Sequence, residues 1–171
     1  MDDKNIFKGA IFDLVQKKVK IKNKYYNRDI IRHPGGVGVV CEMDNKILLV
    51  KQFRHAIDSY TLEIPAGKLE YGENPKECGL RELNEEASIE CDDIQLIQYI
   101  VSTPGFCDEK IWIYKAIHPK PTQNRLSLDE DEEIETIWID IDEAYQMTLK
   151  NEIFDAKTVI GILHTMLERK K

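Results

Sequence analysis

Residues 67–89 read GKLEYGENPKECGLRELNEEASI, and the second half of this stretch carries the signals of an amphipathic helix. Asn74 is a residue type that caps helix N-termini. Pro75 suits the first helical position, because the N–H that proline lacks would have no helical partner there. Glu77 stands at the capping-box spacing from Asn74. The stretch therefore predicts a helix over 75–87.

Three carboxylates crowd one side of this predicted helix. At roughly 100° per residue, Glu82, Glu85 and Glu86 fall within an arc of about 100°. Like charges at these spacings cost roughly 0.2–0.5 kcal/mol per pair. Arg81 lies between Glu77 and Glu85 at a spacing of four residues and can brace one of them, while the small Gly79 leaves space above Glu82. The adjoining sector, which we expect to face the core, consists of Leu80, Leu83 and Ala87.

Two interpretations of this acidic side stand next to each other. Most acidic helix faces are simply solvated, and charge alone does not distinguish such a face from a binding site. The alternative is a site for a hard divalent cation, since Mg²⁺ prefers carboxylate oxygens and keeps water and substrate phosphates as further ligands. The residues that precede the helix decide between the two interpretations.

The spacing of the fixed residues resembles the Nudix box, G-x5-E-x7-R-E-U-x-E-E-x-G-U, in which U is an aliphatic residue. Gly67 is followed after five residues by Glu73 and after seven more by Arg81, and the three helix acids occupy their places in the pattern. Only the final glycine differs, because Ser88 stands there. A glycine would suit a left-handed residue at the end of the helix, so we expect Ser88 to carry mild strain or to end the helix differently.

Further segments resemble the ADP-ribose pyrophosphatase branch of the Nudix hydrolases and follow the order of that family. Pro104 stands where that branch carries its characteristic proline. The segments are HPGGVGVV (33–40), VKQFRHAI (50–57), LEIPAGKLEYGE (62–73), STPGFCDE (102–109), LDEDEEIETIW (128–138) and DAKTVIGIL (155–163). The resemblance implies the Nudix fold, with mixed β-sheets sandwiched between helices and an N-terminal antiparallel strand arm. It implies a single domain over 1–171, with the box at 67–89 and an arm at 1–33 that takes part in homodimerisation.

The activity implied by the resemblance is Mg²⁺-dependent hydrolysis of ADP-ribose to AMP and ribose 5-phosphate, with Mn²⁺ as a possible replacement. By match to the family, the metal ligands are the carbonyl of Ala66 together with Glu82, Glu85, Glu86 and Glu132. Two alternatives stay open. One is a Nudix pyrophosphatase for another nucleoside diphosphate sugar or a dinucleotide, and the other is a non-catalytic module that senses ADP-ribose.

A general base is expected outside the crowded helix, on a segment that closes over the substrate. The very acidic SLDEDEEIE (127–135) matches the catalytic loop of the family, although without that match it would be read as a solvated loop. The match gives Glu130 as the base and Glu132 as a further metal ligand, and any acid within 129–133 can hold the role of base after a shift in register. Glu85 is added to the catalytic residues.

Substrate recognition needs cations and a platform for the base and sugars. Arg54 matches a family position that contacts the diphosphate or the terminal ribose, and Arg28 matches one that reaches the site of the other subunit. Glu109 is expected to accept hydrogen bonds from ribose hydroxyls, while Phe106 shapes its loop. Phe7 is a candidate for stacking on adenine. For the arginines the alternative is a surface salt bridge, and for Phe7 it is a core or dimer contact.

The rest of the chain predicts an α+β fold. Runs typical of strands cover most of residues 12–64 and return at 94–102, 110–117 and 134–141, and the loop between them at 66–74 contains two glycines. Two amphipathic helices close the chain. Because helices do not alternate regularly with strands, a doubly wound parallel sheet is not expected.

The composition excludes several classes of protein. The chain has 171 residues and a net charge of −7, so its overall field repels phosphate backbones and nucleic acid is not an expected partner. Its longest apolar runs last only a few residues, and its start lacks an apolar segment, so neither a membrane span nor a signal peptide is expected. Cys41, Cys78, Cys91 and Cys107 are widely spaced, which favours free thiols and a cytoplasmic location.

Overall fold

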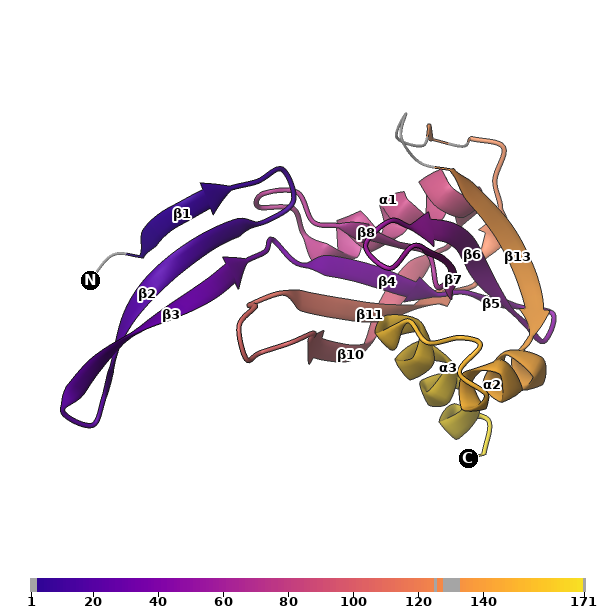
Figure 1. Cartoon of the computed structure of the whole chain (residues 1–171). Coiled ribbons are helices and arrows are strands. Elements are labelled where there is room, and N and C mark those ends of the chain that lie inside the picture. Colours follow the sequence, from indigo (N-terminus) through magenta and orange to yellow (C-terminus); the bar gives the residue numbers. More distant parts are fainter. Residues whose placement is uncertain (1–2, 125, 128–132, 171) are drawn as a thin grey trace.

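The computed structural model describes residues 3–124, 126–127 and 133–170 and arranges them as strands and three helices (Figure 1). The strands of the N-terminal half are β1 (Lys4–Lys8), β2 (Asp13–Ile21), β3 (Lys24–Arg32), β4 (Gly36–Val40), β5 (Glu42–Met43), β6 (Lys46–Arg54), β7 (Ser59–Glu63) and β8 (Ala66–Lys68). The later strands are β9 (Ile89–Glu90), β10 (Asp93–Val101), β11 (Lys110–Ile117), β12 (Lys120–Pro121) and β13 (Ile134–Asp140). The helices are α1 (Pro75–Ala87), α2 (Ile141–Leu149) and α3 (Ala156–Glu168).

The central sheets combine parallel and antiparallel pairing, as the sequence predicts, with the parallel pair in one of them. One sheet has the order β10-β11-β4-β8, in which β11 and β4 run parallel and the outer pairs run antiparallel. In a second sheet β6 lies between β13 and β5, and β6 also pairs with β7. The predicted loop over 66–74 is wrong at its start, because Ala66–Lys68 pairs with β4 and forms β8.

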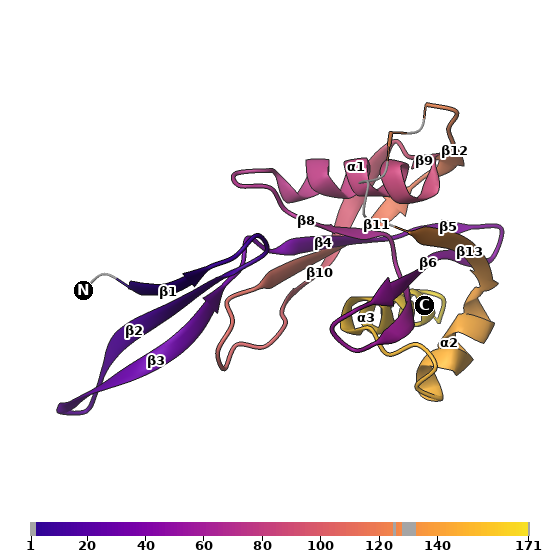
Figure 2. The same cartoon turned by 45° about the horizontal axis from the view of Figure 1, so that its top comes forward.

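Helices cover both sides of these sheets, with α1 on one side and α2 and α3 on the other (Figures 1 and 2). Alternate residues of β4 face α1 on one side of the sheet and α2 and α3 on the other, because successive side chains of a strand point to opposite faces. Val37 and Val39 pack with Leu83 of α1, whereas Val40 packs with Ile162 of α3. The α+β class and the placement of sheets between helices are therefore confirmed.

Helix α1 spans the predicted residues, but its buried face differs from the prediction. Its buried residues are Cys78, Gly79, Glu82, Leu83 and Glu86, while Leu80 and Ala87 are only partly buried. Gly79 does not provide space above the acids. A Cβ there would lie 2.8 Å from Cδ1 of Ile94 and 3.0 Å from Cγ1 of Val37, so glycine lets the helix approach the sheet closely. Carboxylates are thus brought onto the buried side of the helix.

The helix ends at Ser88, which takes the left-handed conformation with φ 54° and ψ 39°. Its N–H donates to the carbonyl of Asn84 at 2.9 Å and so closes the last turn. Of the two expectations for this position, strain in a left-handed turn is the one observed. Serine in place of the motif glycine therefore raises the conformational free energy of the turn but does not change its geometry.

Ser88→Gly is expected to stabilise the protein by about 0.5–1 kcal/mol, because glycine adopts a positive φ without a steric penalty. Urea unfolding followed by circular dichroism measures the change. Ser88→Ala is the matched control, since alanine loses the hydroxyl but keeps the strained Cβ and should not stabilise. Equal stabilities of the glycine and alanine variants would contradict this explanation.

Strands β1–β3 form a separate antiparallel sheet that projects from the body as an arm (Figure 1). Backbone bonds dock the end of β3 against the loop before β11: Ile31 N–H donates to Phe106 O at 2.8 Å, and Asp108 N–H donates to Ile31 O at 3.1 Å. Asp108 also accepts from Arg32 Nη1 at 2.8 Å and from the N–H of His33 at 2.9 Å. The base of the arm is therefore fixed to the loop that contains Phe106.

Candidate active site

Two helix carboxylates meet the backbone at the start of β8. The Ala66 N–H donates to Oε2 of Glu86 at 2.9 Å. A Cβ on Gly67 would lie 1.8 Å from Oε1 of Glu82, so the carboxylate of Glu82 lies directly over Gly67. Glu86 is 3% exposed and Glu82 is 9% exposed. The box glycine thus leaves room for a carboxylate to lie against the strand.

Arg81 holds the acids that surround this corner. Its Nη1 lies 2.8 Å from Oε1 of Glu82 and 2.7 Å from Oε2 of Glu85, and its Nε lies 3.2 Å from Oε1 of Glu73. Burial opposes the charge of Arg81, yet the bond to Glu73 and the charge of Glu82 outweigh burial and raise its pKa. Of the two acids that Arg81 was expected to be able to brace, it contacts Glu85, and it offsets part of the repulsion among the carboxylates.

The carboxylate oxygens of Glu82 and Glu86 beside Ala66 and Gly67 suit a hard divalent cation that completes its coordination with water and substrate. Among the residues that the structure describes, no three His, Cys, Asp or Glu side chains converge into a ready metal cage. Mg²⁺ does not need such a cage, since it is usually bound through one or two carboxylates plus substrate phosphates. Glu82 and Glu86, with the backbone of Ala66 beside them, supply oxygen donors of that kind.

Gly67→Ala is expected to displace the Glu82 carboxylate, because the added methyl group would occupy the place of Oε1. A catalytic group moved by about 1 Å can lose roughly 10- to 100-fold in rate, and we expect a loss of kcat/KM in that range. Steady-state kinetics and Mn²⁺ titration measure the effect. In a Glu82→Ala background the methyl group meets no carboxylate, so Gly67→Ala should then have no further effect; a full additional loss would refute the mechanism.

A second group of charges lies on the face of the β6–β7 hairpin and joins Arg54, a predicted site residue, to Glu63, which the sequence did not single out. Glu63 accepts from Arg54 Nε and Nη2, both at 2.7 Å, and from Lys157 and Thr61. Burial alone would raise the pKa of Glu63, but the bonds from Arg54 and Lys157 lower it to about 2. The sequence signal that could have found Glu63 is its place as an acid between the apolar residues of LEIP. The salt bridge expected as an alternative role of Arg54 is present.

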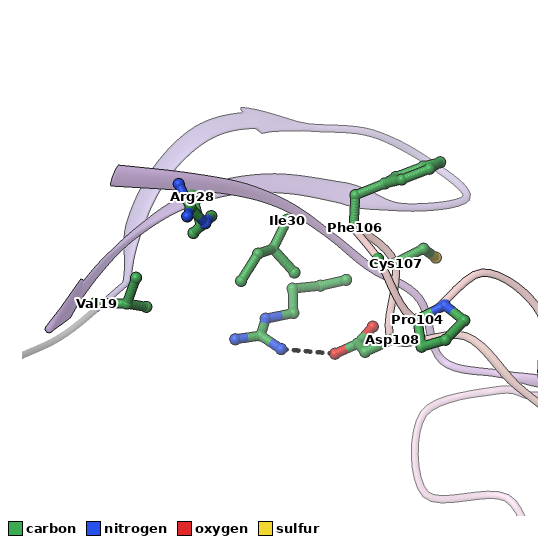
Figure 3. A pocket seen from close by; sticks show the side chains of 9 residues that line it. Val19, Arg28, Ile30, Pro104, Phe106, Cys107 and Asp108 are labelled. Carbon is green, nitrogen blue, oxygen red and sulfur yellow. Dashed lines mark hydrogen bonds and ion pairs between the residues drawn. The ribbon is translucent and has the colours of Figure 1, made fainter. Parts of the chain in front are cut away.

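A pocket of about 420 Å³ opens between the arm and the loop before β11 (Figure 3). Arg28 and Ile30 line it from β3, and Phe106 and Asp108 line it from the loop. The structure therefore brings together Arg28 and Phe106, which the sequence proposed separately as substrate-binding residues. Apolar, aromatic and cationic groups in one hollow suit a ligand with a flat base and anionic groups.

The other predicted site residues lie outside the three groups described above. Glu109 lies beside the pocket loop, with Oε1 3.5 Å from Nδ1 of His33. Phe7 lies on β1, is 55% exposed and packs against Phe12 within the arm; the residues lining the pocket do not include it. Glu130 and Glu132 lie outside the described residues.

The sheets between helices, with an acidic helix against the strand that carries Gly67, define an α+β protein with a site of buried carboxylates. The chain belongs to the Nudix family of hydrolases, because the family model described as NUDIX domain matches residues 32–160. It is 39% identical to a methanol dehydrogenase activator of Bacillus methanolicus and 37% identical to an ADP-ribose pyrophosphatase of Bacillus subtilis. Each alignment covers 165 residues, 95% of this chain and 89% of the relative.

A solved structure described as an ADP compounds hydrolase shares the fold. It superposes with a TM-score of 0.83 at 19% sequence identity and covers 99% of this chain and 92% of its own. At that identity the similarity concerns the fold. None of the described helices is long and apolar enough to cross a membrane.

Proposed function

We propose that this Nudix hydrolase cleaves the diphosphate of ADP-ribose with Mg²⁺ and releases AMP and ribose 5-phosphate. The observation that carries the proposal is the meeting of Glu82 and Glu86 at Ala66 and Gly67. The similarity to an ADP-ribose pyrophosphatase over 95% of the chain supports the choice of substrate. A pocket that combines Arg28 with Phe106 supports it further, since ADP-ribose carries both a base and a diphosphate.

In this proposal the metal site consists of the Ala66 carbonyl, Glu82, Glu85, Glu86 and Glu132. When bound, Mg²⁺ supplies charge neutralisation at the phosphate oxygens and lowers the pKa of water. Mn²⁺ meets the same oxygen-ligand requirement. Arg81 keeps the helix acids in place, because its guanidinium bonds to Glu73 and Glu85 at the edge of the site.

The remaining residues bind substrate and move a proton. Arg54 binds the diphosphate or the terminal ribose, Arg28 reaches the site of the partner subunit, Phe106 shapes the loop that lines the pocket, and Glu109 accepts from a ribose hydroxyl. Phe7 stacks on the adenine held at the partner subunit. Glu130 accepts the proton of the attacking water while the water oxygen bonds to phosphorus, and the bridging oxygen leaves with the other product.

Two alternatives follow from the same residues. Another nucleoside diphosphate sugar or a dinucleotide presents the same diphosphate to the helix acids, so those acids do not distinguish between substrates. A non-catalytic sensor of ADP-ribose could lose its acids without loss of function. This chain retains Glu82, Glu85 and Glu86, which favours hydrolysis.

A hydrolysis panel with Mg²⁺ tests the proposal. ADP-ribose, UDP-glucose, GDP-mannose, NADH and diadenosine polyphosphates are compared by kcat/KM, and AMP and ribose 5-phosphate are identified as products. ADP-ribose should rank among the best substrates. A clear preference for another compound would assign the site to that compound, and absence of turnover together with tight ADP-ribose binding would favour the sensor.

We also propose that the chain forms a homodimer through the arm, residues 1–33, with the whole chain acting as one Nudix hydrolase domain. The arm exposes a set of large apolar and aromatic side chains, which is the usual mark of an interface. They are Ile6, Phe7, Ile11, Phe12, Ile21, Tyr25 and Tyr26.

The four free thiols, two of them buried, favour the reducing cytoplasm as the location of the protein.

Light scattering is expected to give a mass of about twice 19.9 kDa for the protein and a lower mass for Ile6→Asp, because a buried carboxylate without a partner opposes association. Leu167→Asp is the control: Leu167 is a similarly exposed apolar residue on α3, distant in sequence from the arm. An unchanged mass for Ile6→Asp, or an equal change for Leu167→Asp, would contradict an interface on the arm.

A further inference from the structure

The two carboxylate oxygens of Glu63 accept four hydrogen bonds. Its Oε1 accepts from Arg54 Nε and from Thr61 Oγ1, and its Oε2 accepts from Arg54 Nη2 and from Lys157 Nζ. An ionised carboxylate offers about four lone-pair sites, so these four bonds fill them. The side chain is also 3% exposed. Glu63 is therefore not available to bind a metal or to accept a proton from water, although it lies three residues before Ala66.

Arg54 is only partly occupied by this contact. A guanidinium has five N–H donors in a fixed plane, and the two bonds to Glu63 leave three of them for another partner. The Arg54 side chain is 42% exposed, whereas its partner Glu63 is buried. One edge of the guanidinium is thus held by Glu63, and the partly exposed side chain keeps three N–H donors that could bind phosphate oxygens in a bidentate way.

The location of Arg54 connects it to the helix acids. Arg54 is the last residue of β6, and its side chain runs back along the hairpin face to Glu63, whose register partner is Val50. The hydrogen bonds that Arg54 donates to Glu63 raise the pKa of Arg54, and the negative charge of Glu86 adds to this effect. Glu63, to which Arg54 is bonded, lies three residues before Ala66, whose N–H donates to Glu86, so Arg54 is attached to the segment of chain that leads into the site.

Lys157 joins the group from α3. Its Nζ contacts Glu63 and lies 3.1 Å from Oδ1 of Asp155, the N-cap of that helix, and its side chain is 11% exposed. The neighbouring Thr158 accepts from the Ile64 N–H at 2.8 Å. These contacts tie the start of α3 to the segment between β7 and β8, so the charge of Glu63 is balanced from two separate elements.

We propose that Glu63 is a positioning residue: it fixes the plane of the Arg54 guanidinium so that its remaining N–H donors meet the substrate diphosphate, and Lys157 holds the Glu63 carboxylate in place. This inference rests on the proposed cleavage of a diphosphate, but not on the identity of the sugar or base attached to it. A purely structural role for the same ion pair predicts a loss of stability without a specific loss of substrate binding.

The test compares Glu63→Gln, Arg54→Lys and Arg54→Ala on the best substrate of the panel. Glutamine keeps the shape of Glu63 but loses its charge, and lysine keeps the charge of Arg54 but loses the planar fork. We expect KM to rise by roughly 10- to 100-fold in both conservative variants, as for a lost charge-assisted bond, with a much smaller change in kcat. Glu63→Gln in the Arg54→Ala background should raise KM no further, because Glu63 acts through Arg54.

Binding of ADP with EDTA present gives a readout that needs neither turnover nor metal, and its Kd should rise by the same factor. Glu42→Gln is the matched control, since Glu42 is a partly buried acid whose Oε1 lies 2.9 Å from Nζ of Lys115, a pair outside the site residues. It should leave KM and Kd unchanged.

If Glu63→Gln is too unstable to measure, the KM and Kd of Arg54→Lys serve as the test. The Arg54 side chain is partly exposed, so this variant should remain folded. A wild-type KM and Kd for Arg54→Lys, or additive effects in the double variant, would overturn the inference. Failure of ADP-ribose as a substrate would overturn the proposed substrate instead, and the comparison on the best diphosphate substrate would remain decisive for Glu63.

Discussion

Glu86→Gln is expected to lower kcat by roughly 10²–10⁴-fold and to weaken metal binding, while the protein stays folded. The carboxylate of Glu86 lies 2.9 Å from the Ala66 N–H and is almost fully buried. A bound metal supplies several kcal/mol of charge stabilisation, and each 1.36 kcal/mol corresponds to a factor of ten. The amide of glutamine can still accept from Ala66, so the local backbone should keep its shape.

Steady-state kinetics, Mn²⁺ titration and thermal unfolding measure these three quantities on one variant. Glu77→Gln is the matched control, because Glu77 lies in the first turn of the same helix and is exposed. It should retain activity and metal affinity. Near-normal turnover of Glu86→Gln would remove Glu86 from the metal site, and unfolding of that variant would show that its role is structural.

Glu130→Gln or Glu132→Gln is expected to lower kcat by roughly 10²–10⁴-fold, which is the range for loss of a general base. The described acids near the helix site are poorly suited to that role: Glu63 has its lone pairs occupied, and Glu73 and Glu85 are paired with Arg81. The base is therefore sought on the acidic segment, where we assign Glu130 as the base and Glu132 as a metal ligand.

The two variants are distinguished by pH and metal. Loss of the base should flatten the acidic limb of the kcat profile, and loss of a ligand should raise the Mg²⁺ concentration needed for half-maximal rate. Glu135→Gln, at an exposed acid on the following strand, controls for the charge of the segment. Two mild effects, at Glu130 and at Glu132, would place the base elsewhere on the chain.

Local signals were sufficient for the central part of the site. The helix over 75–87 was predicted at its observed bounds, because Asn74 caps it and Pro75 starts it. Spacing alone then grouped Glu82 with Glu86. Burial of these acids was not predicted, since apolar periodicity assigned the core to Leu80 and Ala87, whereas close contact at Gly79 turns the carboxylates inward.

Local sequence signals did not predict the contacts between residues far apart in the chain. Glu63 and Lys157 are separated by 94 residues, and Arg32 and Asp108 by 76. No periodicity connects residues so far apart, and each of these pairs exists only because separate elements are packed together. Nothing in the segment LEIP indicated which cations would contact its acid, Glu63.

The sequence by itself therefore determined the family, the acidic helix and the glycine at which its carboxylates lie, because these depend on spacings within one short segment. Only the tertiary structure decided the rest. It showed that β8 forms by pairing with β4, that the arm and the loop before β11 together line an open pocket, and that Arg54 is held by a buried carboxylate. Those features arise from packing between distant segments, where geometry in three dimensions, not order along the chain, determines which charges meet.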